Sequence, residues 1–172
     1  MSRLRGRIKQ GVASRVLAMA MAPTLALGAG MFVAPQTADA AGKANCRVHA
    51  VLASKEGDGK IPKSLEFLRE TLEDDQFAAY KSFHLVDKKT LKLDGDVVSN
   101  ATFSSGHKLG LKLLESKPKL KLHLELSSRD GSKNLVKTDY SIDNNGMFMI
   151  GAGKLKQGEI AGKLFFAIQC KT

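Results

Sequence analysis

Tryptophan is absent from this chain of 172 residues, and only two tyrosines and two cysteines are present. The shortage of Trp and Tyr argues against a transmembrane β-barrel, because such barrels carry girdles of aromatic residues at both membrane interfaces. No C-x-x-C pair occurs, so the redox motif built on that spacing is missing. The four histidines, at positions 49, 84, 107 and 123, show no H-x-x-x-H spacing. The sequence therefore predicts no metal site.

Motifs for enzymatic chemistry are lacking as well. Gly151-Ala152-Gly153 has neither the following helix nor the Lys-Ser/Thr pair of a phosphate-binding loop. Residues 104–107, Ser-Ser-Gly-His, do not form the G-x-S-x-G nucleophile motif. The acidic turns at 94–96 and 143–146 do not complete a calcium-binding loop. We therefore predict no catalytic residue and no cofactor.

The N-terminal 40 residues have the organisation of a secretory signal peptide. A basic segment is followed by an apolar run over 16–35 and by the small-residue cleavage motif Ala38-Asp39-Ala40. The alternative is a retained membrane anchor, since the run is long enough to span a bilayer. The segment has no pair of adjacent arginines, which the twin-arginine export route requires, and no cysteine at the cleavage point, which a lipid anchor requires. The sequence predicts bacterial export to the periplasm or beyond, with no transmembrane segment after cleavage.

The remaining residues, 41–172, suit one domain. They carry 22 basic and 16 acidic side chains, so the net charge falls from +10 for the whole chain to +6. Both cysteines, Cys46 and Cys170, lie in this part, at the start and end of its strands. We expect them to form a disulfide in an exported protein, two buried thiols being the alternative.

Short alternating segments predict a mainly β fold. The leucines over 109–126 alternate with charged residues on both sides of a turn at 116–118, which indicates a hairpin with one apolar face. One helix is expected from Pro62, with an apolar stripe at Leu65, Leu68 and Leu72, and the acids at 73–75 predict an early end. Further strands are expected at 46–53, 80–86, 90–93, 97–103, 135–142, 147–150 and 160–170, with a turn at 87–89. The prediction is an antiparallel β-sandwich of about eight strands with one short helix.

Several segments also match a family pattern. They are the helix start at 61–68, the strand pair at 77–93, the turn and strand at 146–153, and the last strand at 158–168. In this order the chain resembles small exported proteins of myxobacteria and related bacteria, although Ile61 stands where their pattern has Asp. The resemblance implies the fold and no catalytic residue.

The polar face of the leucine hairpin is the main candidate binding site. It would contain Lys108, Lys112, Lys117, Lys119, Lys121 and His123. If Leu113 stands opposite Leu120, Lys112 faces Lys121, and a bound anion would relieve that repulsion. The alternative is a solvated face that discourages edge-to-edge aggregation.

We expect an exported, non-catalytic binding or structural module of the cell envelope or the secreted fraction. Its partner would be an anionic envelope component or another protein, and nucleic acid is not expected because no aromatic stacking platform is visible. One alternative is a carrier of a small apolar ligand, held between the sheets or in a small barrel. A second is a small secreted hydrolase.

Overall fold

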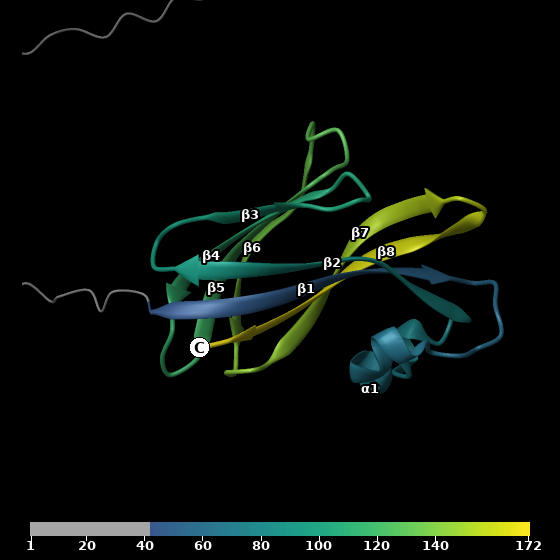
Figure 1. Ribbon diagram of the computed structural model, residues 1–172, viewed down its shortest axis with the longest axis horizontal. Helices are drawn as coiled ribbons and strands as arrows, with labels where there is room; N and C mark the ends of the chain where they lie inside the picture. The colour runs from purple at the N-terminus through teal and green to yellow at the C-terminus, as the bar shows by residue number, and fades with distance from the viewer. Residues whose placement is uncertain (1–41) are drawn as a thin grey trace, which may run out of the picture. The chain divides into compact units, whose positions relative to one another are not determined.

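Antiparallel strands make up most of the described chain, which covers residues 42–172 of the computed structural model (Figure 1). The predicted signal peptide at 1–40 lies outside these residues. The strands are β1 (Lys43–Ser54), β2 (Ser82–Asp94), β3 (Ser99–Thr102), β4 (Lys108–Glu115), β5 (Leu120–Ser127), β6 (Asn134–Ile142), β7 (Met147–Gln157) and β8 (Ile160–Lys171).

Two four-stranded sheets contain these strands, in the orders β2-β1-β8-β7 and β3-β4-β5-β6. Every neighbouring pair is antiparallel. The first and last strands, β1 and β8, lie side by side in the middle of one sheet. The predicted mainly β sandwich of about eight strands is therefore confirmed.

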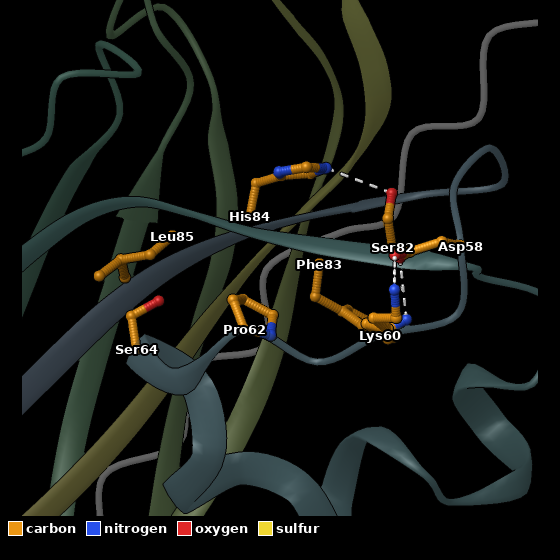
Figure 2. A pocket seen from close by; sticks show the side chains of 8 residues that line it. All are labelled: Asp58, Lys60, Pro62, Ser64, Ser82, Phe83, His84 and Leu85. Atoms are coloured by element: carbon orange, nitrogen blue, oxygen red, sulfur yellow. Dashed lines mark hydrogen bonds and ion pairs between the residues drawn. The ribbon is translucent and has the colours of Figure 1, made fainter.

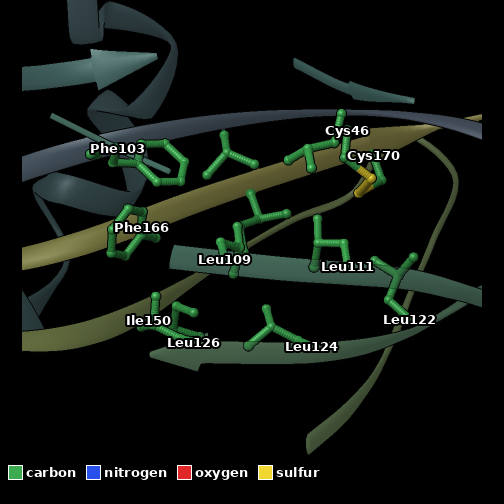
Figure 3. Packing of buried hydrophobic residues seen from close by; sticks show 14 of the residues in the cluster. Cys46, Phe103, Leu109, Leu111, Leu122, Leu124, Leu126, Ile150, Phe166 and Cys170 are labelled. Atoms are coloured by element: carbon green, nitrogen blue, oxygen red, sulfur yellow. A yellow bond between two sulfur atoms is a disulfide. The ribbon is translucent and has the colours of Figure 1, made fainter. Parts of the chain in front are cut away.

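The leucine hairpin supplies one wall of the main core. All seven of its inward leucines, at 109, 111, 113, 120, 122, 124 and 126, are completely buried. They pack against the inner face of the other sheet, including Val48, Leu52, Phe166 and Ile168. Figure 3 shows five of these leucines, at 109, 111, 122, 124 and 126, in one cluster with Phe166 and the disulfide. The alternation read from the sequence thus determines which face is buried.

A short helical segment covers the outer face of the sheet that contains β1. It begins with the 3₁₀ segment η1 (Lys63–Leu68), continues as α1 (Arg69–Leu72) and is followed by the 3₁₀ turn η2 (Asp75–Phe77). The predicted stripe of leucines at 65, 68 and 72 is buried in a second apolar cluster with Val51, Ala53, Phe83 and Ala167. The helix is expected to begin at Pro62; Pro62 is instead the extended residue before the first helical residue, Lys63, while the early end is confirmed. None of the helical segments within residues 42–172 is both long enough and apolar enough to cross a membrane.

The disulfide between Cys46 and Cys170 is present. The two residues stand directly opposite each other in the pairing of β1 with β8, with their Cα atoms 4.1 Å apart. Both are fully buried. The bond therefore joins the first and last strands of the sandwich, as the sequence predicted.

The turn expected at 87–89 is wrong. These residues lie inside β2, which runs without interruption from Ser82 to Asp94. The pairing with β1 shifts by one residue at Val86, which stands opposite no residue of β1, and such a bulge bends a strand without ending it. The polar run after it lies on an edge strand, where exposed lysines are common because they discourage pairing with another chain.

The expected register of the leucine hairpin is also wrong. Leu113 stands opposite Leu122, and Lys112 stands opposite His123, not Lys121. The cause is the loop: Glu115 pairs with Lys121, so the connection is longer than the two-residue turn expected at 116–117, and it shifts the register at the tip by three residues. A bulge at Leu114 reverses one residue of that shift, and the two lysines do not face each other.

Candidate functional site

The predicted lysine face lies on the outer side of the sheet that contains β4 and β5. Three of its lysines are bound to carboxylates. The Nζ–O distances are 3.1 Å for Lys112 with Asp96, 3.1 Å for Lys119 with Asp143 and 3.2 Å for Lys121 with Glu115. Lys108 and Lys117 are exposed; Lys108 begins β4, and Lys117 lies in the loop after its other end. The structure therefore does not bring these lysines together into one cationic site.

His123 is the centre of a mixed-charge network on the same face. Its Nδ1 lies 2.6 Å from an Asp139 oxygen, and its Nε2 lies 3.3 Å from Glu125. Lys137 binds Glu125 as well, at 2.6 Å. Hydrogen bonds to Asp139 and Glu125 raise the pKa of His123 above its usual value. The face thus carries positive and negative charges side by side.

A surface pocket of about 430 Å³ lies between β2 and the start of the helical segment. Figure 2 shows its lining, with Ser82 and His84 on one strand and Asp58 beside Lys60. His84 Nε2 is 3.2 Å from Ser82 Oγ, a pair of groups that nucleophilic catalysis requires. This is the arrangement closest to a hydrolase site among the pockets described here.

The hydrogen bonds of this pair run in the wrong direction for catalysis. Ser82 Oγ donates its proton to the carbonyl oxygen of Glu56 at 2.5 Å, so the Ser82 oxygen accepts from the His84 N–H. A general base must instead accept the hydroxyl proton. Asp58 forms an ion pair with Lys60 at 3.0 Å, and this contact lowers the pKa of Asp58. Asp58 is therefore engaged by Lys60, and the pocket does not contain a Ser-His-Asp relay.

A second hollow, of about 360 Å³, lies at the turn end of the β7–β8 hairpin. We call it the hairpin groove. Its apolar lining comes from Ala53, Leu155, Ala161, Gly162 and the ring of Tyr80. Its polar lining comes from Ser54, Lys55, Glu56, Lys154 and Lys163. Such a mixture of apolar wall and few charged groups is typical of small-molecule sites.

A bulge in β7 lies next to the hairpin groove. The pairing with β8 shifts at Ala152, between Gly151 and Gly153, and Gly153 has a φ of +100° that favours glycine. Beyond the bulge, Lys154 stands directly opposite Lys163. Residues directly opposite in an antiparallel pair project to the same face, so two ammonium groups share one side of the sheet.

Neither lysine of this pair has a carboxylate partner in the described chain. Between residues 42 and 172, no Asp or Glu oxygen lies within 4.0 Å of the Nζ atoms of Lys55, Lys154 or Lys163. Lys163 instead lies over the ring of Phe165, with its Nζ 5.2 Å from the ring centroid. Glu56 is the only acid in the lining. The hairpin groove therefore has an excess of positive charge.

Close packing forms one wall of the groove. A Cβ atom at Gly162 would collide with the carbonyl oxygen of Ala53. Glycine therefore allows the β8 backbone to approach the end of β1 at this point. Tyr80 packs its ring against Phe165 in an edge-to-face contact, with centroids 5.8 Å apart.

Sequence reasoning misses the hairpin groove because the strand that it predicts stops at residue 150. Gly151-Ala-Gly153 has the composition of a break, whereas it is the bulge within β7. The sequence nevertheless contains information that could have predicted the lysine pair. A two-residue turn at Gly158-Glu159 places Gln157 opposite Ile160, and three further residues along each strand bring Lys154 opposite Lys163.

The other titratable candidates remain separate. His49, His84 and His123 lie on β1, β2 and β5, and His107 precedes β4. In the part of the chain that the structure describes, no group of three or more His, Cys, Asp or Glu side chains is placed to hold a metal ion.

Comparisons with family models, with curated proteins and with solved structures found no match to this chain. The resemblance to exported myxobacterial proteins stays a prediction.

Proposed function

We propose that this protein is an exported, non-catalytic binding module that engages an anionic partner through the hairpin groove. The observation that supports this proposal is the cross-strand pair Lys154 and Lys163, which has no carboxylate within 4.0 Å among residues 42–172. Like charges directly opposite each other in a sheet are destabilising, and a bound anion relieves that repulsion.

Two further observations support the proposal. The Ser82–His84 pair has hydrogen bonds that oppose base catalysis, which weighs against the hydrolase alternative. The buried Cys46–Cys170 disulfide suits an oxidising compartment, in agreement with the predicted signal peptide. The disulfide and the signal peptide together favour periplasmic or extracellular residence.

The test compares two charge reversals that change the net charge equally. One is Lys154→Glu with Lys163→Glu; the matched control is Lys112→Glu with Lys121→Glu, on the outer face of the other sheet. Retention of the protein on immobilised dextran sulfate is measured against salt concentration. We expect the first pair to elute at lower salt than the control pair. Equal loss by both pairs would indicate general charge attraction and would contradict a site in the groove.

The reverse ranking also has a clear meaning. Greater loss with Lys112→Glu and Lys121→Glu would identify the predicted lysine face, residues 108–123, as the anion-binding surface. Circular dichroism and the unfolding midpoint of each variant establish that both remain folded.

Export is tested separately, by cell fractionation and mass spectrometry of the natural product. We expect a chain that begins at Ala41, contains the oxidised disulfide and lies outside the cytoplasm. Recovery of the full chain from Met1 in the cytoplasm would contradict the export proposal.

A further inference from the structure

The hairpin groove combines apolar and cationic lining in one small volume, and we propose that it binds a fatty carboxylate. In this arrangement, the carboxylate lies at Lys154 and Lys163, and the hydrocarbon chain lies on the apolar lining. The inference rests on the proposed function, because it uses the same lysine pair, and it adds the chemical class of the ligand.

The apolar lining is the first reason. Ala53, Leu155, Ala161, Gly162 and Tyr80 line the groove. Ala53 and Leu155 are buried beneath it, so the apolar surface that a ligand can reach comes mainly from Ala161 and the half-buried Tyr80. A small hydrophilic anion would bind the lysines and leave this surface exposed to water. A hydrocarbon chain covers it and is stabilised by removal from water.

The charge is the second reason. A neutral hydrocarbon would leave Lys154 and Lys163 opposite each other without an anion. The lining contains three lysines and one glutamate, so its net charge is positive. The complementary ligand therefore carries negative charge at one end and is apolar along the rest.

The volume is the third reason. About 360 Å³ lies near the lower end of the range of small-molecule sites, which is about 300–1,000 Å³. This space suits one hydrocarbon chain better than the two chains of a phospholipid.

The two tyrosines of the chain provide a direct measurement. Tyr80 lines the groove, whereas Tyr140 stacks on Phe148 with ring centroids 4.3 Å apart, away from the groove lining. Titration with acetate, hexanoate and decanoate is followed by the NMR signals of both rings and by calorimetry. We expect decanoate to shift the Tyr80 signals at a stoichiometry of one and to leave those of Tyr140 unchanged.

Affinity should increase with chain length and depend on the lysines. Each added methylene is expected to strengthen binding about two- to four-fold until the groove is full. Lys154→Gln with Lys163→Gln should weaken decanoate binding by about ten-fold or more and change decanol binding much less. Lys112→Gln with Lys121→Gln is the matched control, and should leave decanoate binding unchanged.

Glu56 gives a change of the opposite sign. Its carboxylate repels the ligand's carboxylate, so Glu56→Gln should strengthen decanoate binding, by about two- to five-fold for an exposed charge. Ala161→Gln places a polar amide on the apolar lining and should weaken decanoate binding without changing retention on dextran sulfate.

The outcomes separate the two proposals. If dextran sulfate retention depends on Lys154 and Lys163 but decanoate binds no tighter than acetate, the anionic-partner proposal stands and the fatty-carboxylate inference is overturned. Decanoate binding that ignores both lysines would also overturn the inference, because the ligand would then lie elsewhere. If neither ligand depends on the pair, both proposals fail.

Discussion

Removal of the Cys46–Cys170 disulfide should strongly destabilise the sandwich. The bond joins residues 124 apart in sequence, so it closes nearly the whole described chain into one loop. In the chain-entropy model, a loop of this length restricts the unfolded state by about 5 kcal/mol at 25 °C. Total stabilities of single domains are about 5–15 kcal/mol, so this contribution decides whether the reduced domain stays folded.

Urea unfolding followed by far-ultraviolet circular dichroism measures the effect. The oxidised protein is compared with the protein reduced in denaturant and refolded with reductant, and with Cys46→Ala plus Cys170→Ala. With a slope of about 2 kcal/mol per molar urea, the unfolding midpoint should fall by about 2.5 M on reduction. The double variant should lose somewhat more, because both cysteines are fully buried and removal of their sulfur atoms leaves a cavity.

The mechanism has its own signature. Because the bond limits expansion of the unfolded chain, the urea slope should be larger for the reduced protein than for the oxidised one. A midpoint shift below about 0.5 M, or an unchanged slope, would refute the argument from the unfolded state. In the first case the pairing of β1 with β8 would suffice by itself, since nine residues of β1, from 45 to 53, are paired with β8.

Three further predictions concern the folded state. Leu124→Ala, in the fully buried centre of β5, should cost about 2–5 kcal/mol in urea unfolding, whereas Leu135→Ala, at a 40% exposed position, should cost less than about 0.5 kcal/mol; similar losses would contradict the assigned core. Gly162→Ala should cost about 1–3 kcal/mol, because its methyl group meets the backbone of Ala53; a neutral result would mean that β8 can move away from β1. His49→Leu should flatten the dependence of the unfolding free energy on pH between about pH 7 and 5; an unchanged slope would assign the dependence to other groups.

The sign of the His49 effect follows from its surroundings. Burial lowers its pKa below the usual value of 6.5, and the charges of Lys88 and Arg47 lower it further. Its buried Nδ1 has no hydrogen-bond partner in the described chain, and its ring lies 4.4 Å from that of Phe67. As the pH falls below about 6.5, the unfolded chain takes up a proton that folded His49 resists. The unfolding free energy therefore falls until the folded-state pKa is reached, while His123, with its raised pKa, contributes in the opposite direction.

The spacing of apolar residues predicted the strands and the helical segment that bury one face and expose the other. The alternating leucines of β4 and β5 are all buried, and the stripe at Leu65, Leu68 and Leu72 lies under the helical segment as expected. Burial of one face requires apolar residues at fixed intervals, so the sequence must show that interval. The disulfide was predicted on a different ground, namely two cysteines, in the first and last strands, of a chain expected to be exported.

Bulges were not predictable in this way, because a single extra residue leaves no repeat. Val86, Leu114 and Ala152 each shift the register of one strand pair. Each one-residue shift has little effect on packing of the core. On the exposed face it has a large effect, because the register decides which charged side chains lie opposite each other. In the β4–β5 hairpin the loop and the bulge at Leu114 together place Lys112 opposite His123, and Lys112 and Lys121 each bind a carboxylate.

The β7–β8 hairpin shows the reverse case. Its two-residue turn places Gln157 opposite Ile160, and unbroken pairing from there aligns Lys154 with Lys163 on one face. The bulge at Ala152 changes the pairing only beyond this pair, where Gly151 stands opposite Phe165. Packing of the core does not require two like charges in register, since Leu155 is buried on the other face of the same hairpin. The turn therefore sets the register of the pair, and the proposed anionic ligand at the hairpin groove would offset the repulsion that this register brings.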